Sequence, residues 1–500
     1  MDTLNLLLEG FIVASTGSNL LFCLIGVTIG MVVGVMPGIG PVAGTALLIP
    51  ITYSLDATTA IIMLSGIFYG CMYGGTITSV LINVPGESAS VITCLDGHEM
   101  AKQGRAGAAL GVAAIGSFFG GTVAILALVF VGPPIARFAL KFGPPEYFSL
   151  MMFGLLMLNA LVGKSLIKGV MATCFGMLLA TIGQEPMTGL VRFSFGFTEL
   201  IGGIDFVLIA MGLFGISEIL GSLGKDSVVQ IKEKITSFLP RRDEYKDAAL
   251  AILRGTGVGL FLGLIPGASA VISSIISYSV EKKVAKDPSR FGKGAIEGIA
   301  GPETANNAHA GAAMIPLFTL GIPSSATVAL LLGAFIMHGL APGPALFEKN
   351  PQFVWGVIAS MFIGNAILLF FNLPMANFWA KLILIPYRIL YPFILIITMI
   401  GAYSISNSFW SVGVMLVFGV IGYFLKKLEF PLAAITLSFV LGTQIELTLL
   451  QSLSGSKNGM MIFFTRPISA AIMGLCLVVI LFSIVSRIRK SKYVVESEDD

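Results

Sequence analysis

The feature that most constrains this chain is a glycine-rich motif that occurs twice. Residues 26–38 read GVTIGMVVGVMPG, and residues 255–267 read GTGVGLFLGLIPG. Both copies follow the pattern G-x3-G-x3-G-x2-P-G, and with 59 Gly and 23 Pro among 500 residues a given start position matches it by chance about once in 100,000. Two copies 229 residues apart therefore indicate an internal duplication.

The motif predicts a helix that ends abruptly inside an apolar segment. Glycines at every fourth position share one helix face and let a second backbone approach closely. The Pro-Gly pair then breaks the helix. One interpretation is tight helix packing alone. The other is that the break presents helix-end N–H groups to a solute at membrane depth, where irregular backbone is tolerated only if it lines an enclosed cavity. We favour the second because the break occurs twice.

Composition places the chain in a membrane. It is 56% hydrophobic and 11% charged with a mean hydropathy of +0.92, and apolar runs of about 18 or more residues recur along it. We expect an all-α polytopic membrane protein with about 11–12 transmembrane segments. The net charge of +3 comes from Lys and Arg scattered in short loops, which argues against nucleic-acid binding. The five cysteines are isolated, so neither a disulfide framework nor a metal knot is indicated.

Basic residues predict the topology. With the N-terminus periplasmic and the C-terminus cytoplasmic, 24 of the 30 Lys and Arg fall in cytoplasmic loops. Segment 248–280 then enters from the cytoplasm, turns at Pro266-Gly267 and returns, which makes it a re-entrant hairpin. The equivalent hairpin, 20–54, has no flanking basic residue and enters from the other side. About five crossings between the hairpins make the two repeats inverted.

Each predicted repeat also contains a broken helix. The first runs over 57–95 and is interrupted at Tyr73-Gly74-Gly75 and again at Asn83-Val-Pro85-Gly86, and the second runs over 295–338 with its break at Pro323. A basic insertion near 281–293 accounts for the longer spacing in the second repeat. The expected domains are a first membrane repeat over 1–221, a cytoplasmic linker over 222–247, a second membrane repeat over 248–486 and a cytoplasmic tail over 487–500.

The two turns and the two breaks supply the candidate substrate-binding residues. Broken helices leave N–H donors free, and hydroxyls follow the breaks, so both kinds of group are suited to a carboxylate. The hydroxyls fit the role of plain helix caps equally well. The candidates are Pro37, Gly38, Ile39, Gly40, Asn83, Pro85, Gly86, Ser88, Pro266, Gly267, Ala268, Ser269, Pro323, Ser324 and Ser325.

A second polar group lies in the apolar, Gly/Ala-rich stretch before Pro323. Glu303, Thr304, Asn306 and Asn307 stand beside His309, and polar groups in such a stretch are costly and usually functional. They form either an interhelical hydrogen-bond cluster or a site for a coupling cation. Hard oxygen ligands suit Na⁺ rather than a transition metal. We expect no other cofactor, and neither a Walker loop nor a nucleophile-base constellation indicates an ATP-driven or enzymatic protein.

A set of short motifs points to a known family. They are Gly34-Val-Met-Pro-Gly38, Tyr73-Gly-Gly-Thr, Asn83-Val-Pro-Gly86, Leu95-Asp-Gly97, Pro302-Glu-Thr-Ala-Asn-Asn307, Leu320-Gly-Ile-Pro323 and Thr465-Arg-Pro-Ile468. Together they resemble the large membrane subunit of the tripartite tricarboxylate transporters, the TctA family, over residues 20–486. Ser324 departs from the family pattern, where we expect Gly.

The resemblance implies a secondary, cation-coupled permease in a bacterial inner membrane. It implies two partners: a small four-helix membrane subunit, and a periplasmic solute-binding protein that delivers citrate or another carboxylate. The leading expectation is a carrier that moves organic anions by alternating access. The alternative is a stand-alone organic-anion carrier or a channel without a binding protein. If the hairpin tips approach each other from opposite faces, Ile39→Cys should be labelled from the periplasm and Ala268→Cys from the cytoplasm.

Overall fold

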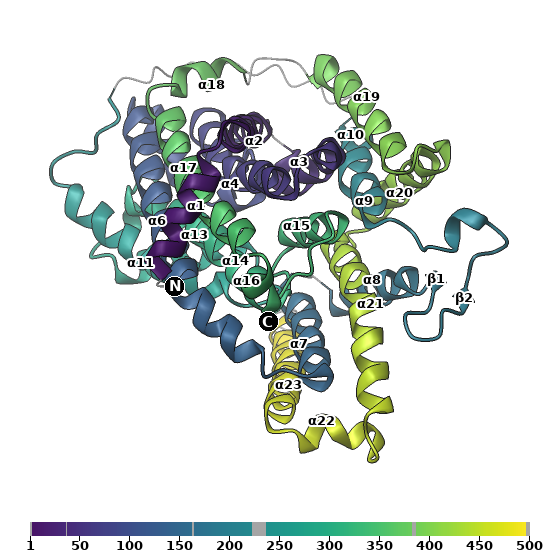
Figure 1. Ribbon diagram of the computed structural model, residues 1–500. Helices are drawn as coiled ribbons and strands as arrows, with labels where there is room; N and C mark the ends of the chain where they lie inside the picture. The colour runs from purple at the N-terminus through teal and green to yellow at the C-terminus, as the bar shows by residue number, and fades with distance from the viewer. Residues whose placement is uncertain (1–2, 37, 163–164, 223–236, 383–386, 497–500) are drawn as a thin grey trace. The chain divides into compact units, whose positions relative to one another are not determined.

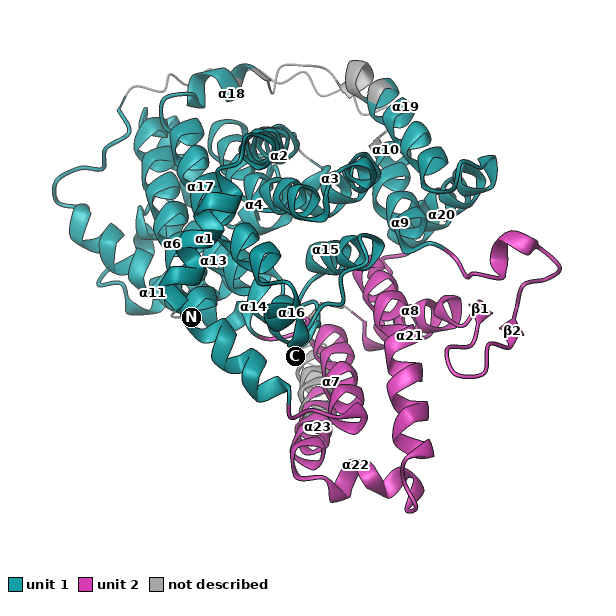
Figure 2. Cartoon of the chain, viewed as in Figure 1, with its two compact units in different colours: residues 1–140, 205–264, 269–427 teal, residues 141–204, 265–268, 428–500 magenta. Residues whose placement is uncertain are grey.

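The computed structural model describes residues 3–36, 38–162, 165–222, 237–382 and 387–496 (Figure 1). Nearly every described segment is helical, and the β-structure among them is one antiparallel ladder of two residues a strand. Contacts divide the chain into two compact units, drawn in separate colours in Figure 2. The first takes residues 1–140, 205–264 and 269–427, and the second takes residues 141–204, 265–268 and 428–500.

The first unit holds the first glycine motif and residues 255–264 of the second. Its elements are α1 (Thr3–Ala14), α2 (Gly17–Val35), α3 (Gly40–Leu48), η1 (Ile49–Ser54), α4 (Ala57–Ile82), η2 (Ser88–Val91), α5 (Thr93–Lys102), α6 (Ala106–Ala139), α9 (Phe206–Ala210), η4 (Met211–Ile216), α10 (Ser217–Ser222), α11 (Tyr245–Gly263), α12 (Ala270–Val284), η5 (Pro288–Arg290), α13 (Glu297–Ala312), α14 (Met314–Leu320), α15 (Ala326–Met337), α16 (Ala345–Lys349), α17 (Pro351–Asn372), α18 (Ala376–Leu382), α19 (Tyr387–Ser406) and α20 (Phe409–Lys427).

The second unit is a smaller helical bundle in which α7 packs on α21 and α23, and α21 packs on α8. Two ion pairs stabilise it: Arg192 with Glu446, at 2.6 and 2.9 Å, and Arg466 with Glu146, at 2.6 Å. Both arginines lie outside the predicted cytoplasmic loops. Its elements are α7 (Pro144–Val162), α8 (Leu166–Ala180), β1 (Gly183–Gln184), β2 (Val191–Arg192), η3 (Thr198–Leu200), α21 (Leu432–Ser454), η6 (Gly459–Met461), α22 (Ile462–Thr465) and α23 (Pro467–Glu496).

Helix length and composition confirm the predicted fold class. Among the described residues, six helices are long and apolar enough to cross a membrane, and a pair bent by 91° near Pro467 would make a seventh. Five shorter apolar helices of 10–17 residues accompany them. The protein is therefore an all-α polytopic membrane protein. The finer count of segments, the division into repeats at 222–247 and the opposite orientation of those repeats stay predictions, and residues 223–236 lie outside the described residues.

In the first copy of the motif, the glycines bring α2 against α4. A Cβ built on Gly26, Gly30 or Gly34 would lie 2.3, 2.6 or 2.3 Å from a carbonyl oxygen of α4. Those oxygens belong to residues 63, 67 and 71, each 37 positions after its glycine. Any larger side chain would collide with backbone, so the glycines are needed for this close packing.

The second copy repeats this packing in the same register. The glycines of α11 face the carbonyl oxygens of Gly301, Ala305 and His309 in α13, and a Cβ on them would lie 2.3, 2.4 or 2.7 Å away. Each partner here comes 46 positions after its glycine. This offset is nine residues longer than in the first copy. The duplication therefore includes the helix contacts of the motif as well as its amino-acid sequence.

The two helix breaks show the same nine-residue difference in spacing. The interruption predicted at Tyr73-Gly74-Gly75 is wrong, because α4 continues through these residues, where Gly74 packs against the backbone of α2. Helix α4 ends at Asn83 and α14 ends at Gly321, and both residues adopt a left-handed conformation, with φ of 56° and 69°. These two positions are 238 apart, whereas the motifs are 229 apart. The second half thus contains nine additional residues between its hairpin and its α13 contacts, as the predicted insertion near 281–293 requires.

Both motifs lead into helical hairpins. Near the first turn, a Cβ on Gly44 of α3 would lie 2.6 Å from the Val33 side chain of α2, so the two helices fold back on each other. In the second hairpin, Arg254 of α11 donates to Glu281 of α12 through Nε, at 2.8 Å. Because these residues stand about equally far from Pro266-Gly267, their pairing shows that α12 returns alongside α11.

Candidate functional site

The polar residues predicted on 303–307 lie in α13, at the centre of the first unit. Helix α13 packs against α4, α5, α6, α11 and α12. Glu303 and Asn306 are each 1% exposed, and Asn307 is 3% exposed. Polar groups buried to this extent need partners, because an unsatisfied one is costly away from water.

The two sides of the first break hold Glu303. Thr76 of α4 donates its hydroxyl to Glu303 Oε2 at 2.6 Å. Thr93, the first residue of α5, donates to Glu303 Oε1. A carboxylate of the second half is therefore bound by hydroxyls of the first half.

Glu87 lies within that break and meets the same helix. Asn306 Nδ2 donates to Glu87 Oε1 at 3.0 Å, and the Ala89 peptide N–H donates to Glu87 Oε2 at 2.7 Å. Glu87 is 5% exposed. It was not among the predicted site residues, although a carboxylate directly after Pro85-Gly86 in an apolar segment is a signal by itself. We name Glu87, Glu303, Asn306, Thr76 and Thr93 the carboxylate cluster.

The remaining predicted residues of α13 differ in their roles. Asn307 donates to Ser117 of α6 at 2.7 Å and to the Glu303 carbonyl oxygen at 3.2 Å, so it ties α13 to α6. Thr304 donates to Ala300 of its own helix at 2.6 Å, and its side chain packs against Gly116. The structure does not bring the Thr304 hydroxyl into the carboxylate cluster.

The tip of the first hairpin is partly exposed to solvent. Pro37 lies outside the described residues, Gly38 is exposed, and Ile39 and Gly40 are half-buried. Gly38 adopts φ of 97°, which disfavours any other residue. A Cβ on Gly38 would lie 3.3 Å from Glu218 Oε1, and Lys426 donates to the other oxygen of that carboxylate. The sequence does not predict this ion pair, because its two residues stand 208 positions apart and no motif links them.

The first break packs on the same hairpin. A Cβ on Gly86 would lie 2.0 Å from the carbonyl oxygen of Gly34, near the end of α2. Asn83 and Ser88 are exposed and Pro85 is half-buried. The structure thus brings the predicted residues of the first break beside the first hairpin, close to its turn at Gly38.

The tip of the second hairpin is buried. Pro266, Gly267 and Ala268 are buried, and a Cβ on Gly267 would lie 2.3 Å from the peptide nitrogen of Leu158 in α7. Ser269 is half-buried at the start of α12, and its side chain makes no cap hydrogen bond. The two turns therefore have different surroundings, and their predicted approach to each other stays a prediction.

The second break contains one cap and one orphan hydroxyl. Ser325 Oγ accepts the peptide N–H of Val328 at 3.4 Å, as a plain helix cap does. Ser324, after the buried Pro323, is fully buried, and its hydroxyl has no partner among the described residues. By the spacing of the breaks, Ser324 is the counterpart of Gly86.

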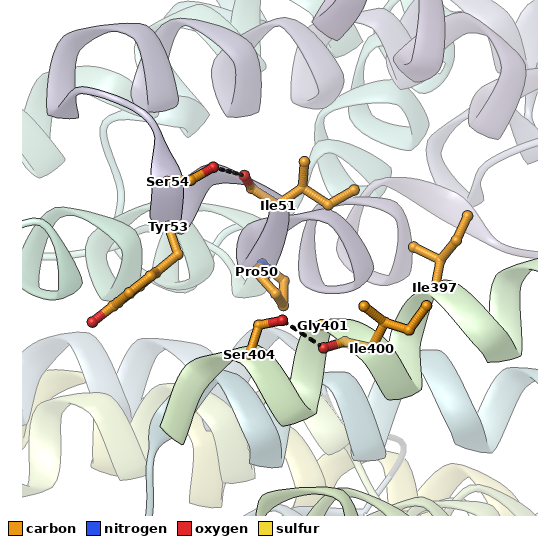
Figure 3. Close-up of a pocket in the computed structure, with 8 residues that line it drawn as sticks. All are labelled: Pro50, Ile51, Tyr53, Ser54, Ile397, Ile400, Gly401 and Ser404. Carbon is orange, nitrogen blue, oxygen red and sulfur yellow. Dashed lines mark hydrogen bonds between the residues drawn. The ribbon is translucent and has the colours of Figure 1, made fainter. Parts of the chain in front are cut away.

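A pocket of about 400 Å³ lies between η1 and α19 (Figure 3). Its eight lining residues carry no charge, and its serine hydroxyls donate to carbonyls nearby: Ser54 to Ile51 at 3.5 Å and Ser404 to Ile400 at 2.8 Å. Such a lining offers little to a carboxylate, so we do not assign the substrate to it. Within the described residues, no group of three His, Cys, Asp or Glu is arranged to hold a metal ion.

Duplicated hairpins, broken helices and buried carboxylates within apolar helices define a polytopic membrane transport protein. Residues 20–437 match the model of the tripartite tricarboxylate transporter TctA family, and the chain belongs to that family. This confirms the resemblance seen in the motifs. The family is one of transporters rather than enzymes.

Two relatives come from Agrobacterium vitis. One, described as an uncharacterized 52.8 kDa protein in the TAR-I ttuC′ 3′ region, is 45% identical over 502 residues, covering all of both chains. The other, described as an uncharacterized protein in the TAR-II ttuC′ 3′ region, is 45% identical over 242 residues, covering 48% of this chain and all of the relative. No solved structure matches the chain.

Proposed function

We propose that this chain is the large permease subunit of a secondary transporter that imports tricarboxylates or related organic carboxylates by alternating access. A periplasmic solute-binding protein delivers the substrate, and a small four-helix membrane subunit completes the complex in the bacterial inner membrane. Membership of the TctA family is the observation that supports this proposal most directly. The bias of Lys and Arg supports a periplasmic N-terminus and a cytoplasmic C-terminus.

A gradient of Na⁺ or H⁺ drives the import in this proposal. Glu303, Asn306 and Asn307 are the residues we assign to cation coupling, and Thr304 assists by packing α13 against α6. Their burial supports the assignment, because ionisable groups inside a membrane are rare and mark ion pathways. The hydroxyls and amides around them stabilise negative charge without supplying a positive one.

The substrate site includes the first hairpin tip, from Pro37 to Gly40, and the neighbouring break at Asn83, Pro85, Gly86 and Ser88. The exposure of Gly38, Asn83 and Ser88 and the Lys426–Glu218 pair beside Gly38 support this assignment. A substrate carboxylate that reaches Gly38 replaces Glu218 as the partner of the Lys426 ammonium. Of the counterparts in the second half, Ser269 and Pro323 to Ser325 form the other part of the site, and Pro266, Gly267 and Ala268 remain predicted substrate-binding residues of the second unit.

Reconstitution tests the proposal. Proteoliposomes hold this chain with its small partner, candidate binding proteins are added outside, and uptake of labelled carboxylates is followed under imposed Na⁺ or H⁺ gradients. We expect saturable uptake that requires both a gradient and a binding protein. Equal uptake without the binding protein would indicate a stand-alone carrier, and flux that does not saturate would indicate a channel.

The role of Lys426 is tested in the same vesicles. We expect Lys426→Gln to raise the KM for the carboxylate about tenfold, which corresponds to the loss of one partly exposed charge contact. Lys427→Gln is the matched control, because Lys427 stands over the Tyr423 ring instead. Equal KM values in the two variants would remove Lys426 from the substrate site.

A further inference from the structure

The carboxylate cluster contains two carboxyl groups and no positively charged side chain. Glu87 and Glu303 are 5% and 1% exposed. Each of their four carboxylate oxygens accepts a hydrogen bond from a neutral group: a threonine hydroxyl, the Asn306 amide or the Ala89 peptide. Among the described residues, no Lys, Arg or His contacts either carboxylate. Two buried charges without a counter-ion are costly, so the cluster favours the binding of a cation.

Asn306 shows where a ligand is missing. Its Nδ2 donates to Glu87, and its Oδ1 is buried without any partner in the part of the chain that the structure describes. A buried carbonyl oxygen needs a donor or a cation. Because Asn306 follows Glu303 by one helical turn, this orphan oxygen lies on the same face of α13 as the Glu303 carboxylate.

The ligand chemistry favours a metal cation over a proton. Both partners of the Glu87 carboxylate, the Ala89 peptide and the Asn306 amide nitrogen, only donate hydrogen bonds. With the Asn306 amide in this orientation, neither of these two partners offers an acceptor to a proton on Glu87. Carboxylate, amide and hydroxyl oxygens are hard ligands, which suit a small monovalent ion such as Na⁺.

We propose that Glu87 of the first half and Glu303 and Asn306 of the second half form one Na⁺ site that exists only while the two halves are in contact. This inference rests on the proposed function and deepens it, because it adds Glu87 to the site and names the ion. Thr76 and Thr93 position the Glu303 carboxylate. The bound ion joins the break after α4 to α13, and its release leaves two carboxylates that repel each other.

This arrangement couples ion binding to conformation. A ligand shifts a conformational equilibrium only by its difference in affinity between the states. Since the site draws ligands from both halves, Na⁺ binds the state in which the break and α13 are together and stabilises that state. Any movement that separates Glu87 from Asn306 releases the ion.

Na⁺ binding by the purified, detergent-solubilised protein tests the site without substrate or binding protein. The thermal unfolding midpoint is measured against NaCl, with choline chloride keeping the ionic strength constant. We expect a saturable rise for the wild type, and a half-saturating Na⁺ concentration raised at least about tenfold in Glu87→Gln and in Glu303→Gln. Glu348→Gln, an exposed carboxylate change in α16, is the control and should behave as the wild type.

Two results would overturn the site: no Na⁺-specific rise in the wild type, or an unchanged half-saturation in Glu87→Gln. If Glu87→Gln does not fold, Glu87→Asp keeps the charge and withdraws it by one methylene, and its half-saturation should still rise. Because the measurement needs no substrate, absent carboxylate uptake would contradict the proposed function alone, and absent Na⁺ binding would contradict this site alone.

Discussion

The carboxylate of Asp96 accepts a hydrogen bond from the hydroxyl of Tyr278 at 2.9 Å. The other oxygen of the same carboxylate accepts four successive peptide N–H groups, from residues 292–295, at 2.7 to 3.1 Å. Asp96 is fully buried. Helix α5 of the first half is thereby fastened to α12 of the second hairpin and to residues 292–295, which follow that hairpin.

We expect Asp96→Asn to lower the stability of the folded protein, because the amide loses the charge that five donors share. Hydrogen bonds to a charged group are worth about 1.5–3 kcal/mol, so the loss should reach about 2 kcal/mol, whereas Tyr278→Phe should cost about 1 kcal/mol. Thermal unfolding in detergent measures both. Equal stability of Asp96→Asn and the wild type would show that this contact contributes little.

The glycine face of α11 predicts a contrast within one helix. Gly259→Ala places a Cβ 2.4 Å from the Ala305 carbonyl oxygen, and overpacking of this kind costs about 1–3 kcal/mol. Gly257→Ala, two residues earlier, meets nothing within 4 Å and should be neutral or slightly stabilising. The two unfolding midpoints are compared directly. Similar midpoints would mean that α11 and α13 separate easily.

Ser324→Ala separates a structural from a binding role. The change removes a buried hydroxyl without a partner in the described residues, so we expect the unfolding midpoint to stay or rise, since such a group costs about 1–3 kcal/mol. If the hydroxyl binds substrate, the KM for the carboxylate should rise in the same variant. A lower midpoint with an unchanged KM would contradict both expectations.

Asn307→Leu should abolish uptake while the protein stays folded. The substitution removes the donor that reaches Ser117 and the Glu303 carbonyl oxygen, and this loosens the helix that presents the coupling residues. Uptake in vesicles and gel filtration of the complex are the two measurements. Retained uptake with the same cation dependence would defeat the assignment of Asn307.

Cysteine labelling tests the hairpins in a background without the five native cysteines. In this structure Ile39 is half-buried and Ala268 is fully buried against its neighbours, so Ile39→Cys should react faster with an impermeant thiol reagent. The inverted topology requires labelling of Ile39→Cys from the periplasm and Ala268→Cys from the cytoplasm, with protection by substrate. Labelling of both from one side would refute the inversion, and labelling without protection would move the substrate site elsewhere.

The sequence alone determined the fold class, the helix breaks and the polar group on 303–307. Hydropathy indicates whether a segment enters a membrane, and Pro-Gly pairs indicate where a helix ends. Both properties are local, so the amino-acid sequence shows them directly. The duplication was visible because glycines recur at a spacing that helix packing requires. The departure of Ser324 from the family pattern was also recognisable from the sequence.

Only the tertiary structure decided which of these residues meet. Glu87 and Asn306 stand 219 positions apart, and no spacing in the chain predicts that they bond. The same holds for the Lys426–Glu218 pair beside Gly38, and for the α7 backbone that fills the space at Gly267. The Thr304 hydroxyl donates to the Ala300 carbonyl oxygen of its own helix, although Glu303 and Asn306 belong to the carboxylate cluster. The physical reason is that burial and charge compensation depend on the elements packed around a residue, which lie far from it in sequence.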